Sequence, residues 1–169
     1  MSDFGTHWTI YHSPIGPLTL VAGPRGLTHL SFPGGFRVPA ETAKQPLPEV
    51  ARQLDAYFAG ELREFDLPLD PRGTPLELAV WRALLEIPYG QTASYGEQAA
   101  RIDPSLFAGA EPWQRARLVG AANGRNPLAI VVPCHRVIGA DGSLTGYGGG
   151  LDRKRALLDL ESSRQLAIL

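Results

Sequence analysis

The stretch that most constrains this chain is residues 126–137, which read Asn-Pro-Leu-Ala-Ile-Val-Val-Pro-Cys-His-Arg-Val and hold the only cysteine. Residues 128–132 are apolar, rich in β-branched side chains and too few for a helix, so we expect a buried strand. Cys134, His135 and Arg136 follow one residue later. A lone cysteine is more often a small buried hydrophobe. A thiol beside histidine and arginine after a strand nevertheless predicts a reactive thiolate.

The composition narrows the class of protein. A chain of 169 residues, 44% of them apolar, can bury a core as one domain or two small ones. A single cysteine excludes an internal disulfide and a cysteine-rich zinc site, and it suits a reducing, cytosolic compartment. Residues 1–7 lack a signal-peptide pattern, and no apolar run reaches membrane-spanning length.

The charge pattern bears on nucleic-acid binding. The net charge of −1 argues against binding through global charge. Residues 112–140, however, contain four arginines and no acidic residue. We call residues 112–140 the one-signed face, because its charged side chains are all positive. Such a face is sufficient to bind phosphates.

The first part of the chain predicts a small antiparallel sheet. Three short runs of β-branched and aromatic residues are separated by turns with proline and glycine. They cover residues 7–12, 18–23 and 27–32. His7, His12 and His29 lie here without cysteine or acidic partners at ligand spacing, so we interpret them as strand or surface histidines rather than a metal site.

A loop, a helix and an edge strand complete the predicted N-terminal domain. Residues 33–48 are rich in proline and glycine, which is typical of a loop. A helix follows, with Val50, Leu54, Tyr57 and Phe58 on its apolar face. Residues 65–70 resemble an edge strand, because Pro68 cannot donate to a ladder. A Pro-Arg-Gly linker then predicts one domain over residues 1–73 and another over 74–169.

The second part predicts a mainly helical domain. Two capping boxes, Thr74-Pro-Leu-Glu77 and Ser94-Tyr-Gly-Glu97, open a core helix and a short helix. A further helix begins at Pro112 and ends near Gly124. Two short helices with arginines on the second suggest a helix-turn-helix, although most such pairs are only packing units.

The faces of these helices can be assigned from their period. The core helix should turn Leu78, Trp81, Leu84 and Leu85 to one side. The helix after Pro112 should bury Leu118, Ala121 and Ala122 and turn Arg117 and Asn123 outwards. Its small residues permit close approach to a flat or narrow partner.

The chain ends with a glycine-rich segment and a helix. Residues 144–150, Leu-Thr-Gly-Tyr-Gly-Gly-Gly, can approach a ligand closely and present backbone N–H groups to it. A flexible linker explains that composition equally well. The closing helix should run from Asp152 to about Ser163, with Glu161 near its end.

Together these segments resemble the O6-alkylguanine-DNA alkyltransferases, the methylated-DNA–protein-cysteine methyltransferases. The resemblance covers nearly the whole chain, and the cysteine motif is highly specific. Its markers are Ser13-Pro-Ile-Gly-Pro-Leu-Thr-Leu, Ile87-Pro-Tyr-Gly, Ser94-Tyr-Gly, Arg117-Leu-Val-Gly, Asn126-Pro, Ile130-Val-Val-Pro-Cys-His-Arg-Val-Ile-Gly and Gly146-Tyr-Gly-Gly-Gly. It implies an α+β fold, with an N-terminal α/β domain carrying a small antiparallel sheet and a mainly helical C-terminal domain with a helix-turn-helix.

The resemblance also implies an activity. The protein would repair DNA by moving the alkyl group of O6-alkylguanine, and of O4-alkylthymine, to Cys134, and would act once because it stays alkylated. Its partner would be double-stranded DNA containing alkylated guanine, with no membrane and no cofactor. Some members carry zinc in the N-terminal domain, but a single cysteine predicts no metal here. We expect a cytoplasmic monomer and leave cooperative assembly on DNA open.

Roles for catalytic residues follow from the same resemblance. His135 would take the thiol proton through a bound water, and Glu161 would hold His135 in the needed tautomer. Asn126 is similar to the family asparagine that braces this network by hydrogen bonding. Arg136 is expected to tie the strand to its neighbours rather than meet DNA.

Roles for DNA-binding residues follow too. Tyr95 matches the tyrosine that reaches the lesion base, and Arg117 matches the finger that fills the gap left by a flipped nucleotide. Tyr147 and the N–H of Gly148 match the loop that closes on the base. The backbone carbonyls of Cys134 and Val137 would accept from the guanine amino group.

One departure and two alternatives stay open. The loop over residues 102–113 is several residues longer than is usual in the family. It could contact DNA, limit the size of the substrate, or have no functional role. A lesion-binding protein without chemistry is one alternative, but such proteins replace the cysteine that this chain retains. A thiol hydrolase is the other, but a direct base usually comes from elsewhere in the fold than the next residue.

Overall fold

The computed structural model describes residues 5–166. By its contacts the chain forms two compact units, residues 1–71 with 127–131, and residues 72–126 with 132–169. The predicted division after residue 73 placed 127–131 in the second domain, whereas this segment packs with the first unit. The signal-peptide prediction rests partly on residues 1–4, which lie outside the described residues.

The first unit is built on a four-stranded sheet. The strands are β1 (His7–Ser13), β2 (Gly16–Gly23), β3 (Gly26–Ser31) and β4 (Ala43–Lys44). Their order is β3-β2-β1-β4, with β1, β2 and β3 antiparallel and β4 parallel to β1. The predicted meander is confirmed, and β4 adds a short parallel strand from within the segment predicted as a loop.

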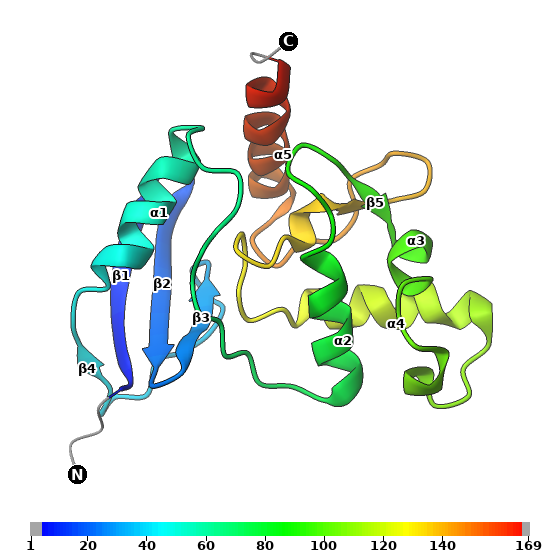
Figure 1. Cartoon of the computed structure of the whole chain (residues 1–169), viewed down its shortest axis with the longest axis horizontal. Coiled ribbons are helices and arrows are strands. Elements are labelled where there is room, and N and C mark those ends of the chain that lie inside the picture. The colour runs from blue at the N-terminus through cyan, green and yellow to red at the C-terminus, as the bar shows by residue number, and fades with distance from the viewer. Residues whose placement is uncertain (1–4, 167–169) are drawn as a thin grey trace. The chain divides into compact units, whose positions relative to one another are not determined.

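Helix α1 (Pro48–Phe58) supplies the apolar surface that pairs with this sheet. Figure 1 shows α1 lying along the strands. Leu54 and Tyr57 are fully buried, as predicted, and so are Leu18 and Leu20 of β2. The alternation of buried and less buried residues along β2 therefore directs one face of the sheet to the core.

Residues 65–70 do not form the predicted edge strand. They make one parallel bridge, Leu27 to Leu69, in which the Leu27 N–H donates to the Pro68 carbonyl at 2.9 Å. The N–H of Asp70 returns a bond to the Leu27 carbonyl. A ladder cannot continue through Pro68, because proline has no N–H to donate.

Residues 128–132 are buried as expected, but they are not a strand. Leu128 makes a single parallel bridge to Leu30 at the edge of β3. Ile130 then adopts a left-handed backbone with φ of 72°, a conformation that β-branched residues rarely take. The Val131 N–H donates to the Ala129 carbonyl in a tight turn. The chain therefore turns after one bridge, and no ladder forms.

The second unit is mainly helical, as predicted. Its elements are α2 (Pro75–Leu84), β5 (Ala93–Ser94), α3 (Tyr95–Ala99), η1 (Pro104–Phe107), α4 (Pro112–Gly124), η2 (Cys134–Arg136), β6 (Val137–Ile138) and α5 (Leu151–Leu166). Both capping boxes are confirmed, at Thr74 and at Ser94. Strands β5 and β6 pair in parallel as a separate two-stranded sheet.

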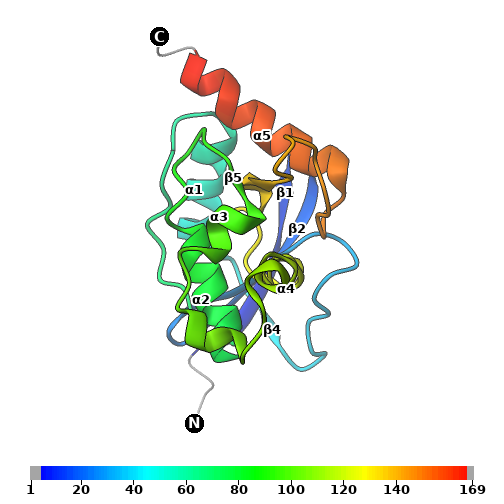
Figure 2. The same ribbon diagram turned by 90° about the vertical axis from the view of Figure 1, so that its right-hand side faces the viewer.

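Helices α3 and α4 pack against each other, and Figure 2 shows α4 nearly end-on beside α3. The buried amides of Gln98 and Asn123 exchange two hydrogen bonds, of 2.9 and 2.8 Å. The outward orientation predicted for Asn123 is therefore wrong. Two predicted core residues, Leu118 and Ala121, are exposed, because the buried face of α4 is set by Val119, Ala122 and Asn123 instead.

Helix α2 follows its prediction except at its end. Trp81 and Leu84 are buried, and the indole N–H of Trp81 donates to the Ala122 carbonyl at 2.9 Å. Leu85 lies just past the helix and is exposed. Over residues 5–166, no helix has the length and apolar character that a membrane crossing requires.

Candidate active site

Cys134 begins the 3-10 helix η2, directly after the buried turn at residues 128–132. Its N–H donates to the Val132 carbonyl at 2.9 Å, and its own carbonyl accepts from the Val137 N–H. The Asn126 side chain donates to the same Val132 carbonyl at 2.8 Å. The residue that carries the thiol is thus held from both sides, while Cys134 itself stays partly accessible.

The two residues that follow Cys134 belong to a buried ion-pair network. The Nε2 atom of His135 is 2.8 Å from Oε2 of Glu161, and both side chains are almost completely buried. The Arg136 guanidinium binds both oxygens of Glu161 and donates to the Ile87 carbonyl at 2.7 Å. Glu161 therefore joins the two residues that follow Cys134, and Arg136 has the structural role expected of it.

The ionisation of this network follows from burial and charge. Burial lowers the pKa of His135, despite the opposing effect of Glu161, so the imidazole is neutral near pH 7. Burial alone would raise the pKa of Glu161, but His135 and Arg136 together lower it to about 2. A neutral imidazole bonded to a carboxylate is the form that accepts a proton.

The Cys134 thiol itself is protonated at rest. Burial raises its pKa, and a hydrogen bond from Asn126 and the positive charge of Lys154 lower it by less. The prediction that His135 and Arg136 stabilise a resting thiolate is therefore wrong, because the imidazole is neutral and the guanidinium is engaged by Glu161. The thiol needs a base at the moment of reaction.

Lys154 on α5 is the site residue that sequence reasoning missed. Its ammonium group donates to the carbonyls of Val137, Thr145 and Gly146, at 2.6, 2.9 and 3.3 Å. Its side chain is buried, and burial lowers its pKa. One signal was available, since Lys154 shares a helical stripe with Leu157 and Glu161 at spacings of three and seven residues.

A pocket of about 130 Å³ opens onto the thiol. Helix α4, the start of α3 and the glycine-rich segment form its walls. It is lined by Tyr95, Gly120, Asn123, Gly124, Cys134, Gly146, Tyr147 and Gly148. The structure thus brings together Cys134 and three of the residues predicted to bind the substrate, namely Tyr95, Tyr147 and Gly148.

The tyrosines of this pocket differ in their surroundings. The Tyr95 hydroxyl lies 3.1 Å from both the carbonyl and the side-chain oxygen of Thr145, so it ties α3 to the glycine-rich segment. Gly120 packs beside the Tyr95 ring, where an added Cβ would lie 3.5 Å from the ring, in ordinary van der Waals contact. Burial raises the pKa of Tyr147 well above its ordinary value, so its phenol stays protonated.

Two predicted DNA-contacting groups lie outside this pocket's lining. Arg117 is exposed on α4. The Val137 carbonyl already accepts from Lys154, and its second lone pair is the one left for another donor. The one-signed face is smaller than predicted, since Arg125 pairs with Glu77 and Arg136 is buried against Glu161.

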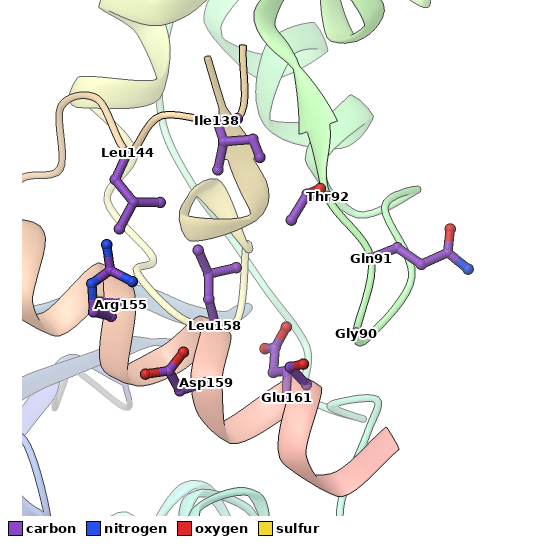
Figure 3. A pocket seen from close by; sticks show the side chains of 11 residues that line it. Gly90, Gln91, Thr92, Ile138, Leu144, Arg155, Leu158, Asp159 and Glu161 are labelled. Carbon is purple, nitrogen blue, oxygen red and sulfur yellow. The ribbon is translucent and has the colours of Figure 1, made fainter. Parts of the chain in front are cut away.

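A second, larger pocket of about 300 Å³ lies between β6 and α5 and does not include the thiol. Figure 3 shows Ile138, Leu144 and Leu158 pointing into it. Glu161 contributes to its wall, but the carboxylate is buried by His135 and Arg136. The smaller pocket, which contains the nucleophile, is the candidate site.

Comparisons with known proteins agree with this geometry. Residues 6–71 match the family model for the ribonuclease-like domain of 6-O-methylguanine DNA methyltransferase, and residues 75–163 match the model for its DNA-binding domain. The chain belongs to the 6-O-methylguanine DNA methyltransferase family. It is similar to the methylated-DNA–protein-cysteine methyltransferase of Mycobacterium tuberculosis, with 54% identity over 96% of each chain.

Other members of this methyltransferase family lie close in sequence and structure. The methylated-DNA–protein-cysteine methyltransferase of Methanosarcina barkeri is 49% identical over 93% of this chain and 98% of its own. The crystal structure of Mycobacterium tuberculosis OGT in complex with DNA matches with a TM-score of 0.83 and 54% identity over 94% of each chain. DNA is therefore the partner of this methyltransferase.

No group of three or more histidine, cysteine, aspartate or glutamate residues is arranged to hold a metal ion within the described part of the chain. His29, one of the three N-terminal histidines, stacks on Phe36 with ring centroids 3.6 Å apart and contacts the Thr28 hydroxyl. These contacts give His29 a packing role in the first unit.

Proposed function

We propose that this chain repairs DNA by moving the alkyl group of O6-alkylguanine, and of O4-alkylthymine, directly to the sulfur of Cys134. The observation that carries the proposal is the placement of Cys134 in the lining of a pocket of about 130 Å³, with a buried His135–Glu161 pair next to it in the chain. A thiolate is a strong, soft nucleophile, which suits attack on the carbon of an O-alkyl group.

The proton movements follow from the ionisation states. The resting thiol gives its proton to neutral His135 through a water molecule. The Nδ1 atom of His135 is buried and has no hydrogen-bond partner among the described residues, so it is the ring nitrogen that takes the proton. Glu161, already ionised, stabilises the imidazolium that results.

The bond changes balance in a single displacement. The sulfur of Cys134 forms a bond to the alkyl carbon while the bond from that carbon to guanine O6 breaks, and the electron pair stays on the base. Tyr95 and the N–H of Gly148 are the donors that we assign to the leaving base, because donors aimed at developing charge lower the barrier. The thioether that forms is stable, so each molecule acts once.

Access to the lesion requires that the nucleotide leave the stack, because the target atom is not reachable inside a duplex. Arg117 is exposed on α4, and small residues follow it at Gly120, Ala121 and Gly124. We assign Arg117 to the gap left by the flipped nucleotide, with the small residues in the minor groove. Asn126 and Val137 keep the bracing and base-binding roles that the family resemblance implies.

We also propose that residues 74–169, apart from 127–131, which pack with the first unit, carry DNA binding and transfer, while residues 1–73 form a separate N-terminal domain. The pocket that opens onto the thiol is lined only by residues of the second unit, which supports the placement of this activity. We expect a monomer in the cytoplasm, in keeping with the single cysteine.

The test is a single-turnover assay with duplex DNA carrying isotopically labelled O6-methylguanine. We expect transfer to stop when one label is bound per protein molecule, and Cys134→Ser to bind the same duplex without accepting label. Transfer that continues past one label per molecule would contradict the proposal. Wild-type protein that binds the lesion but takes no label would point instead to a lesion-binding protein without chemistry.

A further inference from the structure

One exposed stripe of α4 connects the pocket with the helix's N-terminal end. Successive residues of an α-helix are about 100° apart, so residues spaced by three or four share a face. Trp113, Arg117, Gly120 and Gly124 follow this spacing. Gly120 and Gly124 line the pocket around Cys134. Val119 and Ala122 are buried on the other side of the helix, while Asn123 is buried at the edge of the stripe and also lines the pocket.

Trp113 is the unusual member of this stripe. Its side chain is 73% exposed, compared with 52% for Leu85, the next most exposed large apolar side chain among those described. A single exposed apolar residue is common on protein surfaces, so exposure alone decides nothing. Its position is what indicates a contact role, because Trp113 lies one helical turn before Arg117 and on the same face.

The long loop before α4 is built so as to hold Trp113 in this place. Phe107 of η1 is 2% exposed and anchors the loop. Ala108 and Gly109 both have positive φ, of 51° and 79°, which turns the chain back towards α4. The Arg115 guanidinium lies 5.5 Å from the centroid of the Phe107 ring, which joins the loop to the first turn of the helix.

A hydrogen bond fixes the start of the helix as well. The Glu111 N–H donates to the Gln114 side chain at 2.8 Å. These two residues flank Trp113 in the sequence. The backbone that carries the indole is therefore ordered before any partner arrives. A preorganised backbone loses little freedom on binding, which favours Trp113 as a contact residue.

We propose that Trp113 is an additional DNA-contact residue, which packs against the bases and sugars of the duplex that flanks the lesion. The inference rests on the proposed function, because it takes α4 as the helix that faces DNA. Trp113 precedes Arg117 by four residues, or about 6 Å along the helix axis. Since bases in a strand are about 3.4 Å apart, an α4 axis that follows the groove would bring the indole to the duplex about two steps from the position of Arg117.

The chemistry of the stripe favours nucleic acid over protein. Residues 112–140 contain no acidic residue, and Arg117, the next residue of the stripe, is exposed and cationic. Arginine beside an inserted or stacked apolar side chain is a recurring arrangement in minor-groove binding. An aromatic face stacks on any base, so the contact should be independent of sequence.

The experiment compares Trp113→Ala with Trp113→Phe and with Leu85→Ala, an exposed apolar residue outside α4. Each protein is titrated with undamaged duplex of fixed length at fixed salt, and its transfer rate is measured at subsaturating lesion duplex. We expect Trp113→Ala to weaken duplex binding and slow transfer by about tenfold, in line with the loss of one aromatic–base contact. Trp113→Phe should recover most of both, and Leu85→Ala should match the wild type.

Intrinsic fluorescence gives an independent readout. The chain has three tryptophans, and Trp81 is buried while Trp113 is exposed. Addition of duplex should quench the wild-type emission through stacking, and the Trp113→Phe protein should lose most of this change. Thermal unfolding midpoints of all variants should match that of the wild type, because the indole makes few contacts to lose.

The outcomes separate the two proposals. Wild-type protein that fails to accept a methyl group would refute the proposed function, whereas binding of undamaged duplex still tests Trp113. Trp113→Ala protein that binds duplex within twofold of wild type would overturn the inference. So would a change confined to self-association in sedimentation, which would assign Trp113 to contact with a second copy of the chain.

Discussion

The ammonium nitrogen of Lys154 lies 2.6 Å from the carbonyl oxygen of Val137 and 2.9 Å from that of Thr145. Val137 follows the 3-10 helix that begins with Cys134, and Thr145 belongs to the glycine-rich segment that lines the pocket. One buried cation therefore joins the nucleophile's segment to the loop opposite it. The same charge acts on the thiol and lowers its pKa.

Replacing Lys154 with methionine should have two effects. The carbonyls that it bonds lose a buried donor, so the free energy of unfolding should fall by about 1–3 kcal/mol. The pKa of Cys134 should rise, because a positive charge near the thiolate is removed. Urea unfolding and the pH dependence of iodoacetamide labelling measure these effects. Lys44→Met, which removes the exposed lysine of β4, is the matched control, and identical labelling profiles for both variants would rule out the electrostatic role.

Glu161→Gln should destabilise the protein by about 3 kcal/mol at pH 7, because it leaves Arg136 buried without an anion. The pH dependence has a definite sign. Glu161 has a pKa of about 2 in the folded protein and an ordinary value of 4.5, so its contribution is complete above pH 4.5 and is lost as the pH falls towards 2. The difference between wild type and variant should therefore shrink over this range.

Urea unfolding of both proteins between pH 7 and acid conditions measures this difference, with the transfer rate as the functional readout. Transfer should slow in Glu161→Gln, because the imidazolium of His135 loses the carboxylate that stabilises it. A stability difference that stays constant down to acid pH would contradict the assignment of an ionised, paired Glu161.

Much of the fold was predictable because its signals are local. Thr74 and Ser94 cap their helices through residues three positions away, and the period of β2 alone places Leu18 and Leu20 in the core. Ile130 was not predictable in this way, since its left-handed backbone runs against the preference of a β-branched residue. The strand predicted over residues 128–132 therefore does not form, because the chain turns at Ile130.

The residues of the candidate site also differ in whether the sequence could predict them. Cys134 and His135 were singled out from the motif after the apolar run, whereas Glu161 was expected only from the family resemblance. Lys154 was missed because a lysine between charged neighbours is typical of a solvated face, and only the fold shows that its ammonium group meets three carbonyls. The outward face of α4 was misplaced by the choice of Leu118 as a core residue, and Asn123 was consequently left without its partner Gln98.

Asn123→Ala should lower the free energy of unfolding by about 1–3 kcal/mol, because the buried amide of Gln98 loses its reciprocal partner. The double replacement of Gln98 and Asn123 by leucine should recover part of this loss, since apolar groups of similar size leave no amide unsatisfied. Urea unfolding of the three proteins measures both effects. A double variant no more stable than Asn123→Ala would contradict this account.

Arg117→Ala should slow transfer from lesion duplex by roughly tenfold or more, because nothing fills the stack when the nucleotide leaves it. Labelling of Cys134 by a small thiol reagent should be unchanged, since Arg117 does not line the pocket around the thiol. Arg52→Ala on α1, which also removes one exposed arginine, is the control for net charge. Equal transfer rates for all three proteins would show that Arg117 does not assist flipping.

The central claim is that Cys134 accepts the alkyl group from DNA. The most direct measurement is mass spectrometry of the peptide that contains Cys134 after folded protein has been incubated with duplex carrying O6-methylguanine. We predict that this peptide gains the mass of one methyl group, that fragmentation places the group on the sulfur, and that the duplex regains an unmodified guanine. An unmodified Cys134 peptide beside folded, duplex-bound protein would contradict the account.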